Sequence, residues 1–477
     1  MIFSSLLFIF GFFPFAMLIY FLSATFCKRI VVLNFLLCLF SIAFYYWGSG
    51  SAVVIIVFSV VFNWLLGQRI AASRSAATQK WIVACGVVTN IGIIFYFKYM
   101  KFFLDSFSYF FNLPPFDPNI APNLPVGISF YTFMSISYLV DKYRAEHSKC
   151  SFLEYFTYLT LYPHLVAGPI VRHSELSADL KSRRIDLDKL YEGAIRFSIG
   201  LGKKVLLADT LARTVDPIFA MPTGELTLGL AWLAAVCYTF QIYFDFSGYT
   251  DMAIGLAFML GFKFPENFNL PYQAQSMTEF WKRWHMSLSR WLRDYLYFPL
   301  GGNRKGVART LLNLLIVFTL CGLWHGASWT FVVWGLFHGA VLVVERVLDK
   351  KFDIRPSGVF GVLLTFFLAT LGWVLFRSTS FAQALSFFGA MLTTVKDFSL
   401  TAFPQGRLRE FLNIELVYTL ILAAFFSFFP ERWRVLICSN QQRLRIFVEV
   451  VMASVLLTLA SSSLALNTFS PFIYFRF

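Results

Sequence analysis

The chain consists of long apolar runs separated by short polar turns, without the alternation of a half-buried strand. A helix that crosses a membrane needs about 20 mostly apolar residues. Runs that approach this length are 2–26, 30–47, 52–67, 81–98, 125–140, 152–171, 226–246, 248–263, 308–324, 328–348, 359–376, 413–429 and 446–466. Because backbone polar groups inside a bilayer must be satisfied within the chain, such runs favour helices. The pattern predicts an all-α polytopic membrane protein with roughly 11–13 transmembrane or re-entrant helices.

Three stretches interrupt this pattern. Residues 102–124 contain several prolines and predict an irregular connection, and the polar residues 173–190 predict a cytoplasmic loop or a short helix. Residues 264–306 are too polar to cross a membrane, yet they are rich in Trp, Tyr and Phe. Within them, 277–296 predict one amphipathic helix with His285 on its aromatic face. Such a helix suits a membrane interface, either as a simple in-plane anchor or as part of a re-entrant site.

Composition and charge agree with a membrane protein. Of 477 residues, 58% are hydrophobic and only 14% are charged, whereas soluble chains carry roughly 25% charged residues. The net charge of +14 lies largely in basic pairs beside apolar runs, such as Lys28 with Arg29, Arg304 with Lys305 and Lys350 with Lys351. Basic turns stay in the cytoplasm, so we expect a multi-pass membrane protein whose N-terminus lies on the outer side. The sequence has no contiguous basic stripe of the kind that would predict a nucleic-acid surface. It also has no CxxC pair that would support a metal site.

Polar residues inside apolar segments are costly and tend to mark function. The first cluster runs from Gln241 through Asp245 and Tyr249 to Asp251. It is either part of a site or a junction between two helices broken at Gly248. The sequence alone leaves both interpretations open.

Two further clusters contain histidine. One runs from Asn267 and Asn269 to His285, and the other is Trp324-His325-Gly326, with His338 thirteen residues after His325. A histidine can be neutral at physiological pH and still accept a proton, so it is a plausible catalyst in an apolar setting. A packed core histidine is the alternative for each.

The blocks YFDFSGYTD, NFNLPYQ, FWKRWHMSLSRWLRDYL and LCGLWHGASW closely resemble the bacterial branch of the membrane-bound O-acyltransferases (MBOAT). This branch serves O-acetylation of alginate, cellulose and peptidoglycan and D-alanylation of teichoic acid. The resemblance is strongest over 240–340 and extends more weakly to both ends. It implies the MBOAT fold, with helices around a central tunnel, in a single membrane domain over 1–477. We expect N-terminal helices in 1–120, the catalytic core in 121–350 and C-terminal helices in 351–477.

The resemblance also implies site residues. His325 matches the family's catalytic histidine, and His285 matches a second tunnel histidine that is asparagine in other branches. Residues of the matching blocks that we expect to line the tunnel are Asp245, Tyr249, Asp251, Asn269, Trp284, Arg293 and Trp324. We expect His325 to act as general base and His285 to orient an intermediate or donate to it.

The implied activity is transfer of an acetyl group from a cytoplasmic thioester, acetyl-CoA, to an acceptor on the other side of the membrane. The bacterial branch implies the inner (cytoplasmic) membrane, so the N-terminus is expected to be periplasmic. No tightly bound cofactor and no metal is expected. By analogy the acetyl group passes to a separate periplasmic acetyltransferase that acts with the polysaccharide machinery, and alginate is the first choice of polymer. Cellulose and peptidoglycan remain open. The rivals from other classes are a transporter, which would not cleave a thioester, and a scaffold, which would not need either histidine.

Overall fold

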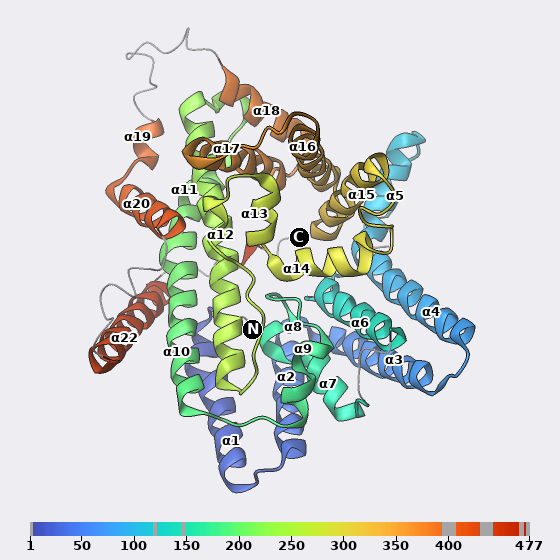
Figure 1. Ribbon diagram of the computed structural model, residues 1–477. Coiled ribbons are helices and arrows are strands. Elements are labelled where there is room, and N and C mark those ends of the chain that lie inside the picture. Colours follow the sequence, from blue (N-terminus) through green and yellow to red (C-terminus); the bar gives the residue numbers. More distant parts are fainter. Residues whose placement is uncertain are drawn as a thin grey trace. The chain divides into compact units, whose positions relative to one another are not determined.

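The structure is a computed structural model that describes residues 3–117, 122–144, 149–393, 407–429, 442–466 and 472–473. Within these residues every regular element is a helix (Figure 1). Among the described residues, eight helical stretches are long and apolar enough to cross a membrane: Phe8–Phe26, Ile30–Ala72, Ala76–Phe110, Leu228–Met259, Val307–His325, Trp329–Phe352, Gly358–Arg377 and Arg443–Leu466. Shorter apolar helices are Phe381–Leu392 and Ile414–Phe428. The all-α polytopic membrane class is therefore confirmed.

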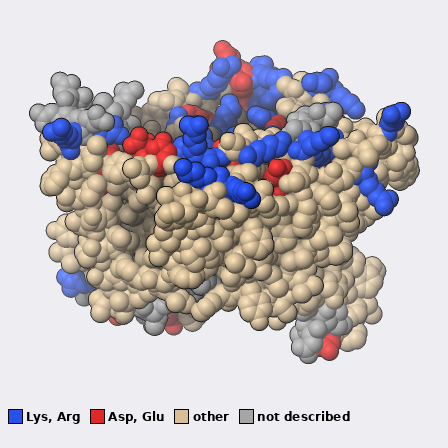
Figure 2. Space-filling view, turned by 90° about the horizontal axis from the view of Figure 1, so that it is seen from below, with Lys and Arg blue, Asp and Glu red and all other residues tan. Residues whose placement is uncertain are grey.

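The surface has the character expected of a protein surrounded by lipid. Large apolar side chains such as Phe26, Trp81 and Val359 are at least three-quarters exposed, and soluble proteins avoid extended surfaces of this kind. Figure 2 shows a face on which uncharged residues cover most of the surface, while Lys and Arg side chains gather along one border. This separation of apolar surface from basic border fits a bilayer and its anionic headgroups.

The residues form two compact units. The first contains Met1–Phe197 and Tyr249–Glu266, and the second contains Ser198–Gly248 and Asn267–Phe477. The sequence division at 120 and 350 is a different one and stays a prediction. Helices of the first unit are α1 (Phe13–Phe26), α2 (Ile30–Ser49), α3 (Val53–Ala72), α4 (Ala76–Ile94), α5 (Met100–Phe110), α6 (Ile128–Tyr143), α7 (Phe152–Thr160), α8 (Tyr162–Leu165), α9 (His173–Lys181) and most of α10 (Leu187–Gly202).

The second unit contains the histidines singled out above. Its helices are α11 (Asp209–Phe219), α13 (Met277–Arg283), α14 (Met286–Leu292), α15 (Val307–His325), α16 (Trp329–Phe352), α17 (Gly358–Arg377), α18 (Phe381–Leu392), α19 (Arg407–Phe411), α20 (Ile414–Phe428) and α22 (Gln442–Leu466). Helix α12 (Leu228–Met259) contributes residues to both units. The helix pair that carries the WHG block, α15 and α16, is closely packed.

Of the two interpretations left open for the first polar cluster, the helix junction broken at Gly248 is excluded. Helix α12 runs without interruption through this residue, so the polar run from Gln241 to Asp251 lies on a helix rather than at a junction. Gly248 serves packing instead, since a Cβ here would come within 2.7 Å of the Gly200 carbonyl oxygen. Small residues permit this close approach of helix backbones in membranes.

Other boundaries also differ from the prediction. The run 152–171 is not one helix, because α7 ends at Thr160 and the short α8 ends at Leu165. Part of 102–124 is helical as α5, while 118–121 lie outside the described residues. The polar stretch 173–190 contains the short helix α9, in agreement with one of the two predicted alternatives.

The apolar runs did not predict α11 or most of α10. Their apolar residues recur at helical spacing among charged ones instead of forming one run. A search for long apolar runs passes over such helices because only one of their faces is buried.

Candidate active site

His285 lies at a sharp break between two short helices. Helix α13 ends at Arg283, α14 begins at Met286, and His285 adopts a left-handed conformation with a φ of 45°. The predicted continuous helix over 277–296 is therefore wrong. Non-glycine residues rarely adopt this conformation, and where they do, surrounding contacts must hold it.

The segment that begins at Asn267 supplies these contacts. The Met286 amide donates to the Asn267 carbonyl oxygen at 2.9 Å, and the Asn269 amide donates to the Arg283 carbonyl oxygen at 2.9 Å. These two bonds lie on either side of the break and hold it open. These hydrogen bonds outweigh the helix propensity of residues 277–296, and they join residues more than ten positions apart along the chain.

The Asn267 side chain fixes the proton on the His285 ring. Its Oδ1 accepts hydrogen bonds from the Ser287 amide at 3.1 Å and from Ser287 Oγ at 2.9 Å. Because a backbone amide only donates, this Asn267 atom must be the oxygen. His285 Nδ1 lies 3.1 Å from the same oxygen and must therefore carry a proton. In the neutral ring Nε2 is then the acceptor nitrogen.

Burial keeps the His285 ring neutral. The side chain is fully buried, and this burial lowers the pKa of His285 to about 3. A charged imidazolium would lose its hydration in this apolar setting. The neutral ring, with its proton on Nδ1, offers an acceptor at Nε2 across the physiological pH range.

His325 ends α15 and is placed by a close helix crossing. A Cβ on Gly322 would collide with the Phe331 carbonyl oxygen, and one on Gly335 would collide with that of Phe318. Glycines at both positions thus let α15 and α16 approach. At Gly326 the missing Cβ makes room for the Phe331 ring. The glycine beside the histidine therefore has a packing function.

The two histidines share one aromatic enclosure. Their ring centroids lie 6.4 Å apart, and His325 is only 4% exposed. Trp324 lies beside both rings, at 6.0 Å from His285 and 4.8 Å from His325. The Phe246 ring also lies against His285, with a centroid distance of 4.7 Å. The rings of Trp334 and Phe376 lie against His325, at 5.2 and 5.3 Å. The arrangement provides nitrogen bases in a site that largely excludes water, where proton transfer and charge stabilisation are effective.

A third histidine extends this enclosure. His338 on α16 is fully buried, and neither of its ring nitrogens has a hydrogen-bond partner among the described residues. Its neighbours are the rings of Trp281 and Trp334, at 5.1 and 4.9 Å. His338 was considered either a catalyst or a packed core residue, and this surrounding of aromatic rings fits a packed core residue.

The other predicted tunnel residues fall into distinct groups. Trp284 is buried and packs on Trp373 at 4.8 Å, but Asn269 and Arg293 are exposed, and Arg293 pairs with Asp294. The Asn269 backbone still supports the His285 break, as described above. Tyr249 and Asp251 belong to the first unit. There, Asp251 pairs with Arg196 at 2.9 Å, and Tyr249 stacks on Phe3 at 5.0 Å.

Asp245 belongs to a buried ionic cluster of the second unit. Lys204 Nζ lies 2.7 Å from Asp245 Oδ1 and 2.6 Å from Asp209 Oδ1. The other Asp245 oxygen accepts a hydrogen bond from the Ile473 amide at 2.9 Å. Burial disfavours the charge on Lys204, but the two carboxylates outweigh it and raise the pKa of Lys204. Lys204 was not predicted as a functional residue, because it stands outside every apolar run and matches no motif.

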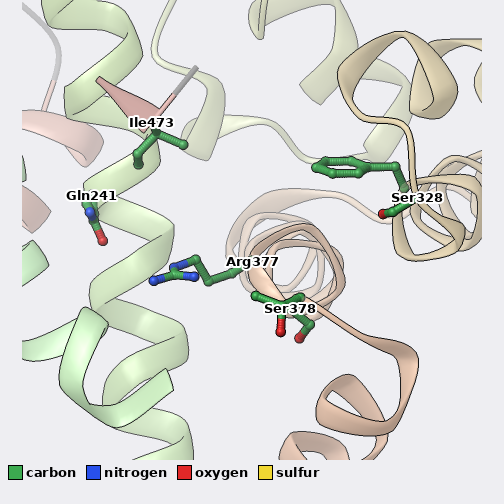
Figure 3. A pocket seen from close by; sticks show the side chains of 7 residues that line it. Gln241, Ser328, Arg377, Ser378 and Ile473 are labelled. Atoms are coloured by element: carbon green, nitrogen blue, oxygen red, sulfur yellow. The ribbon is translucent and has the colours of Figure 1, made fainter. Parts of the chain in front are cut away.

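A pocket of the second unit is lined by residues of α12, α16 and α17, among others, and Figure 3 shows side chains that line it. Its volume is about 270 Å³, and its lining includes Gln241, Ser328, Phe331, Arg377 and Ile473. The Phe331 ring packs on Phe376, which contacts His325. Phe331 and Phe376 therefore connect the pocket wall to the histidine enclosure.

The sequence profile of the membrane-bound O-acyltransferase family matches residues 123–390, more than half of the chain. The chain therefore belongs to this family and is a multi-pass membrane O-acyltransferase. This bears out the resemblance on which the histidines were selected.

Individual relatives cover most of the chain. The probable alginate O-acetylase AlgI of Pseudomonas aeruginosa is 41% identical over 432 residues, covering 90% of this chain and 81% of the relative. That of Pseudomonas putida is 39% identical over 494 aligned residues, with 100% of both chains covered. A peptidoglycan O-acetyltransferase of Helicobacter pylori is 36% identical over 423 residues, covering 82% of this chain and 80% of the relative.

Proposed function

We propose that this protein transfers an acetyl group from a cytoplasmic thioester, most simply acetyl-CoA, to an acceptor hydroxyl at the outer side of the inner membrane. The observation that carries the proposal is the pair of buried histidines 6.4 Å apart in one aromatic enclosure. Relatives named for O-acetylation of alginate support an exported polysaccharide as the modified polymer, with alginate as first choice. Peptidoglycan is the second candidate, because one relative carries that name, and cellulose is the third.

In the proposed mechanism His325 is the general base. It removes the proton of the acceptor hydroxyl as the oxygen attacks the thioester carbonyl, and the C–S bond then breaks. The proton passes from the imidazolium to the departing thiolate, so one ester and one thiol form for each thioester consumed. A positioned base of this kind contributes about 10²–10⁴-fold to the rate.

His285 has a supporting part in this proposal. Its neutral ring carries the proton on Nδ1 and offers an acceptor at Nε2. An acceptor close to His325 favours the charged form of that ring once it has taken the proton. The oxyanion-donor role expected for His285 from the sequence would instead need a proton on Nε2, whereas the Asn267 oxygen holds the proton on Nδ1.

The remaining parts of the proposal concern place and partners. Basic residues at helix ends support an inner-membrane protein whose N-terminus is periplasmic. A separate periplasmic acetyltransferase and the polysaccharide machinery are proposed partners, and membrane lipids cover the exposed apolar helices. No bound cofactor is needed, because both substrates supply their own reacting groups.

The test in cells uses a strain that lacks the protein and is complemented with the wild type, His325→Gln or His173→Gln. His173 is a buried histidine of the first unit and serves as the matched control. We expect the ester content of the exported polymer to be restored by the wild type and the control, but not by His325→Gln at equal protein level. Full restoration by His325→Gln would support the scaffold instead. If the membranes move the acetylated product but leave the donor thioester uncleaved, the transporter interpretation is supported.

A further inference from the structure

The proposed transfer places a negative charge on the thioester carbonyl oxygen, and this charge needs a hydrogen-bond donor. When the acceptor oxygen attacks, the electrons of the carbonyl double bond move onto this oxygen until the C–S bond breaks. Enzymes stabilise such an oxyanion with donors that are fixed in advance. His285 does not supply this donor, because Asn267 keeps its proton on Nδ1 and leaves Nε2 as an acceptor. The donor must therefore come from another residue of the enclosure.

The position of the base limits where this donor can lie. A general base lies about 2.6–3.2 Å from the oxygen whose proton it removes, and an oxyanion donor lies about 2.7–3.1 Å from the oxyanion. Both oxygens are bonded to the same carbon in the tetrahedral intermediate, so the donor must belong to a residue in contact with the base. Trp334 meets this condition, because its ring centroid lies 5.2 Å from that of His325.

The Trp334 indole N–H is a buried donor. The side chain is fully buried, and its Nε1 has no hydrogen-bond partner among the described residues. An indole nitrogen can only donate, and a buried donor without a partner is costly. Such a group in a folded protein is commonly explained by a catalytic role or by a bound water molecule. Its contact with the proposed base favours the catalytic role.

The surrounding rings fix this indole without taking up its N–H. The rings of Trp281, Trp373 and Phe376 lie 5.8, 6.1 and 5.2 Å from it, and none of these side chains has a strong hydrogen-bond acceptor. His338 lies at 4.9 Å, but neither of its nitrogens has a hydrogen-bond partner among the described residues. Ring packing therefore holds the Trp334 donor in place before any substrate arrives.

A close helix crossing places the indole beside the base. Trp334 and Gly335 are neighbours on α16, and a Cβ at Gly335 would collide with the Phe318 carbonyl oxygen on α15. His325 is the last residue of α15. The base and the indole thus belong to two helices whose backbones approach as closely as glycine permits. A site built on packed helices holds its groups more precisely than a site on loops.

We propose that Trp334 is a further catalytic residue, whose indole N–H donates to the oxyanion formed when the acceptor hydroxyl attacks the thioester. The inference rests on the proposed function and deepens it by naming the missing donor. The new C–O bond forms as His325 takes the hydroxyl proton, and the carbonyl electrons move onto the oxygen that Trp334 holds. They return as the C–S bond breaks, and the thiolate takes the proton from His325. The base thus moves the proton, while the indole stabilises the charge.

The test uses open membrane fragments from the strain that lacks the protein, complemented with each variant at equal protein level. The native acceptor is then present, and both sides of the membrane are accessible. Thiol release from acetyl-CoA is measured relative to the uncomplemented strain. Trp334→Phe removes the N–H and part of the ring, whereas benzothienylalanine at position 334 keeps the ring size and replaces the N–H with sulphur. For both we expect kcat to fall about 10²–10³-fold, as is typical of one oxyanion donor, with a smaller change in the KM for acetyl-CoA.

Trp373 provides the matched control. It is buried and packs on Trp334 from α17. Trp373→Phe, and benzothienylalanine at position 373, alter this packing but keep the Trp334 N–H, so we expect a kcat close to that of the wild type. The pH dependence of kcat should keep its shape in the Trp334 variants, because His325 remains the base. A shifted pH profile would mean that the substitution displaces His325, and it would overturn the catalytic assignment.

The outcomes separate this inference from the proposed function. If the wild type releases no more thiol than the uncomplemented strain, the proposed function fails, and the inference fails with it. If the wild type is active, His325→Gln is inactive and benzothienylalanine at position 334 leaves kcat unchanged, only the assignment of Trp334 fails. If benzothienylalanine lowers kcat equally at positions 334 and 373, the indoles have a shared structural role and the inference is overturned.

Discussion

Asn267 offers the sharpest test of the histidine geometry, because one oxygen atom determines which His285 nitrogen carries the proton. Asn267→Ala removes the acceptor that now serves His285 Nδ1 and both donors of Ser287. The Nδ1-protonated ring then has a buried donor without this partner. We expect the ring to shift toward the other tautomer, which places a proton on Nε2 and removes the acceptor near His325.

The size of the effect follows from the hydrogen bond that is lost. A buried donor left without a partner costs about 1–3 kcal/mol. Such a difference between the two tautomers lowers the productive fraction about 5- to 150-fold. Asn267→Asp should behave differently, because its carboxylate accepts the same three hydrogen bonds and keeps the proton on Nδ1. The added negative charge should also raise the pKa of His285 from its depressed value.

The assay is steady-state thiol release by purified variants, together with thermal unfolding in the same detergent. Asn313→Ala is the matched control, because Asn313 is a fully buried asparagine on α15 that donates to the carbonyl oxygen of Gly302. We expect Asn313→Ala to lower stability but not kcat of the folded fraction. Equal kcat values for the wild type and Asn267→Ala would refute the tautomer argument, and so would a kcat of Asn267→Asp as low as that of Asn267→Ala.

Three further predictions concern pH and packing. Burial lowers the pKa of His285 to about 3, so the unfolded chain binds a proton at this residue at a higher pH than the folded chain does. The folded state should therefore lose stability as the pH falls from about 6.5 toward 3. His285→Asn should make the free energy of unfolding, measured by urea titration at several pH values, depend less on pH, and an unchanged pH dependence would contradict the depressed pKa. Lys204→Met leaves a buried carboxylate without its cation and should cost about 3–5 kcal/mol, seen as a lower melting temperature; wild-type stability would show that the cluster is not buried as described. Gly322→Ala brings a methyl group against the Phe331 carbonyl oxygen and should cost about 1–3 kcal/mol, whereas Gly389→Ala, with open space around its α-carbon, should be neutral or slightly stabilising; equal melting temperatures for the two would argue against the close crossing.

The sequence predicted the class of fold because that property depends on composition and on runs of about 20 apolar residues. It also placed the helices around His325 almost correctly, with 308–324 and 328–348 expected against Val307–His325 and Trp329–Phe352 observed. Both helices begin and end at clear polar or glycine signals. By contrast, helices with one buried face, such as α11, leave no continuous apolar run and were missed.

The histidine site was predicted only in part. His285 and His325 were chosen from their motifs, and they share one enclosure. The break at His285 was not predicted, because 277–296 has helical periodicity and the hydrogen bonds from Asn267 that break it come from outside that segment. Lys204 and Arg377 were missed for a related reason, since their partners Asp245 and Asp216 are far away in the sequence. Pairings of this kind exist only once the helices have packed.

In the proposed mechanism the imidazole of His325 takes the acceptor proton during acetyl transfer. The most direct measurement is a single turnover of isotopically labelled acetyl-CoA by the purified protein, following thiol release and label in ester linkage together. For the wild type we expect the two products in equal amounts. For His325→Ala, with an unchanged melting temperature, we expect a rate at least about 100-fold lower. Transfer by folded His325→Ala at the wild-type rate would show that His325 does not take this proton.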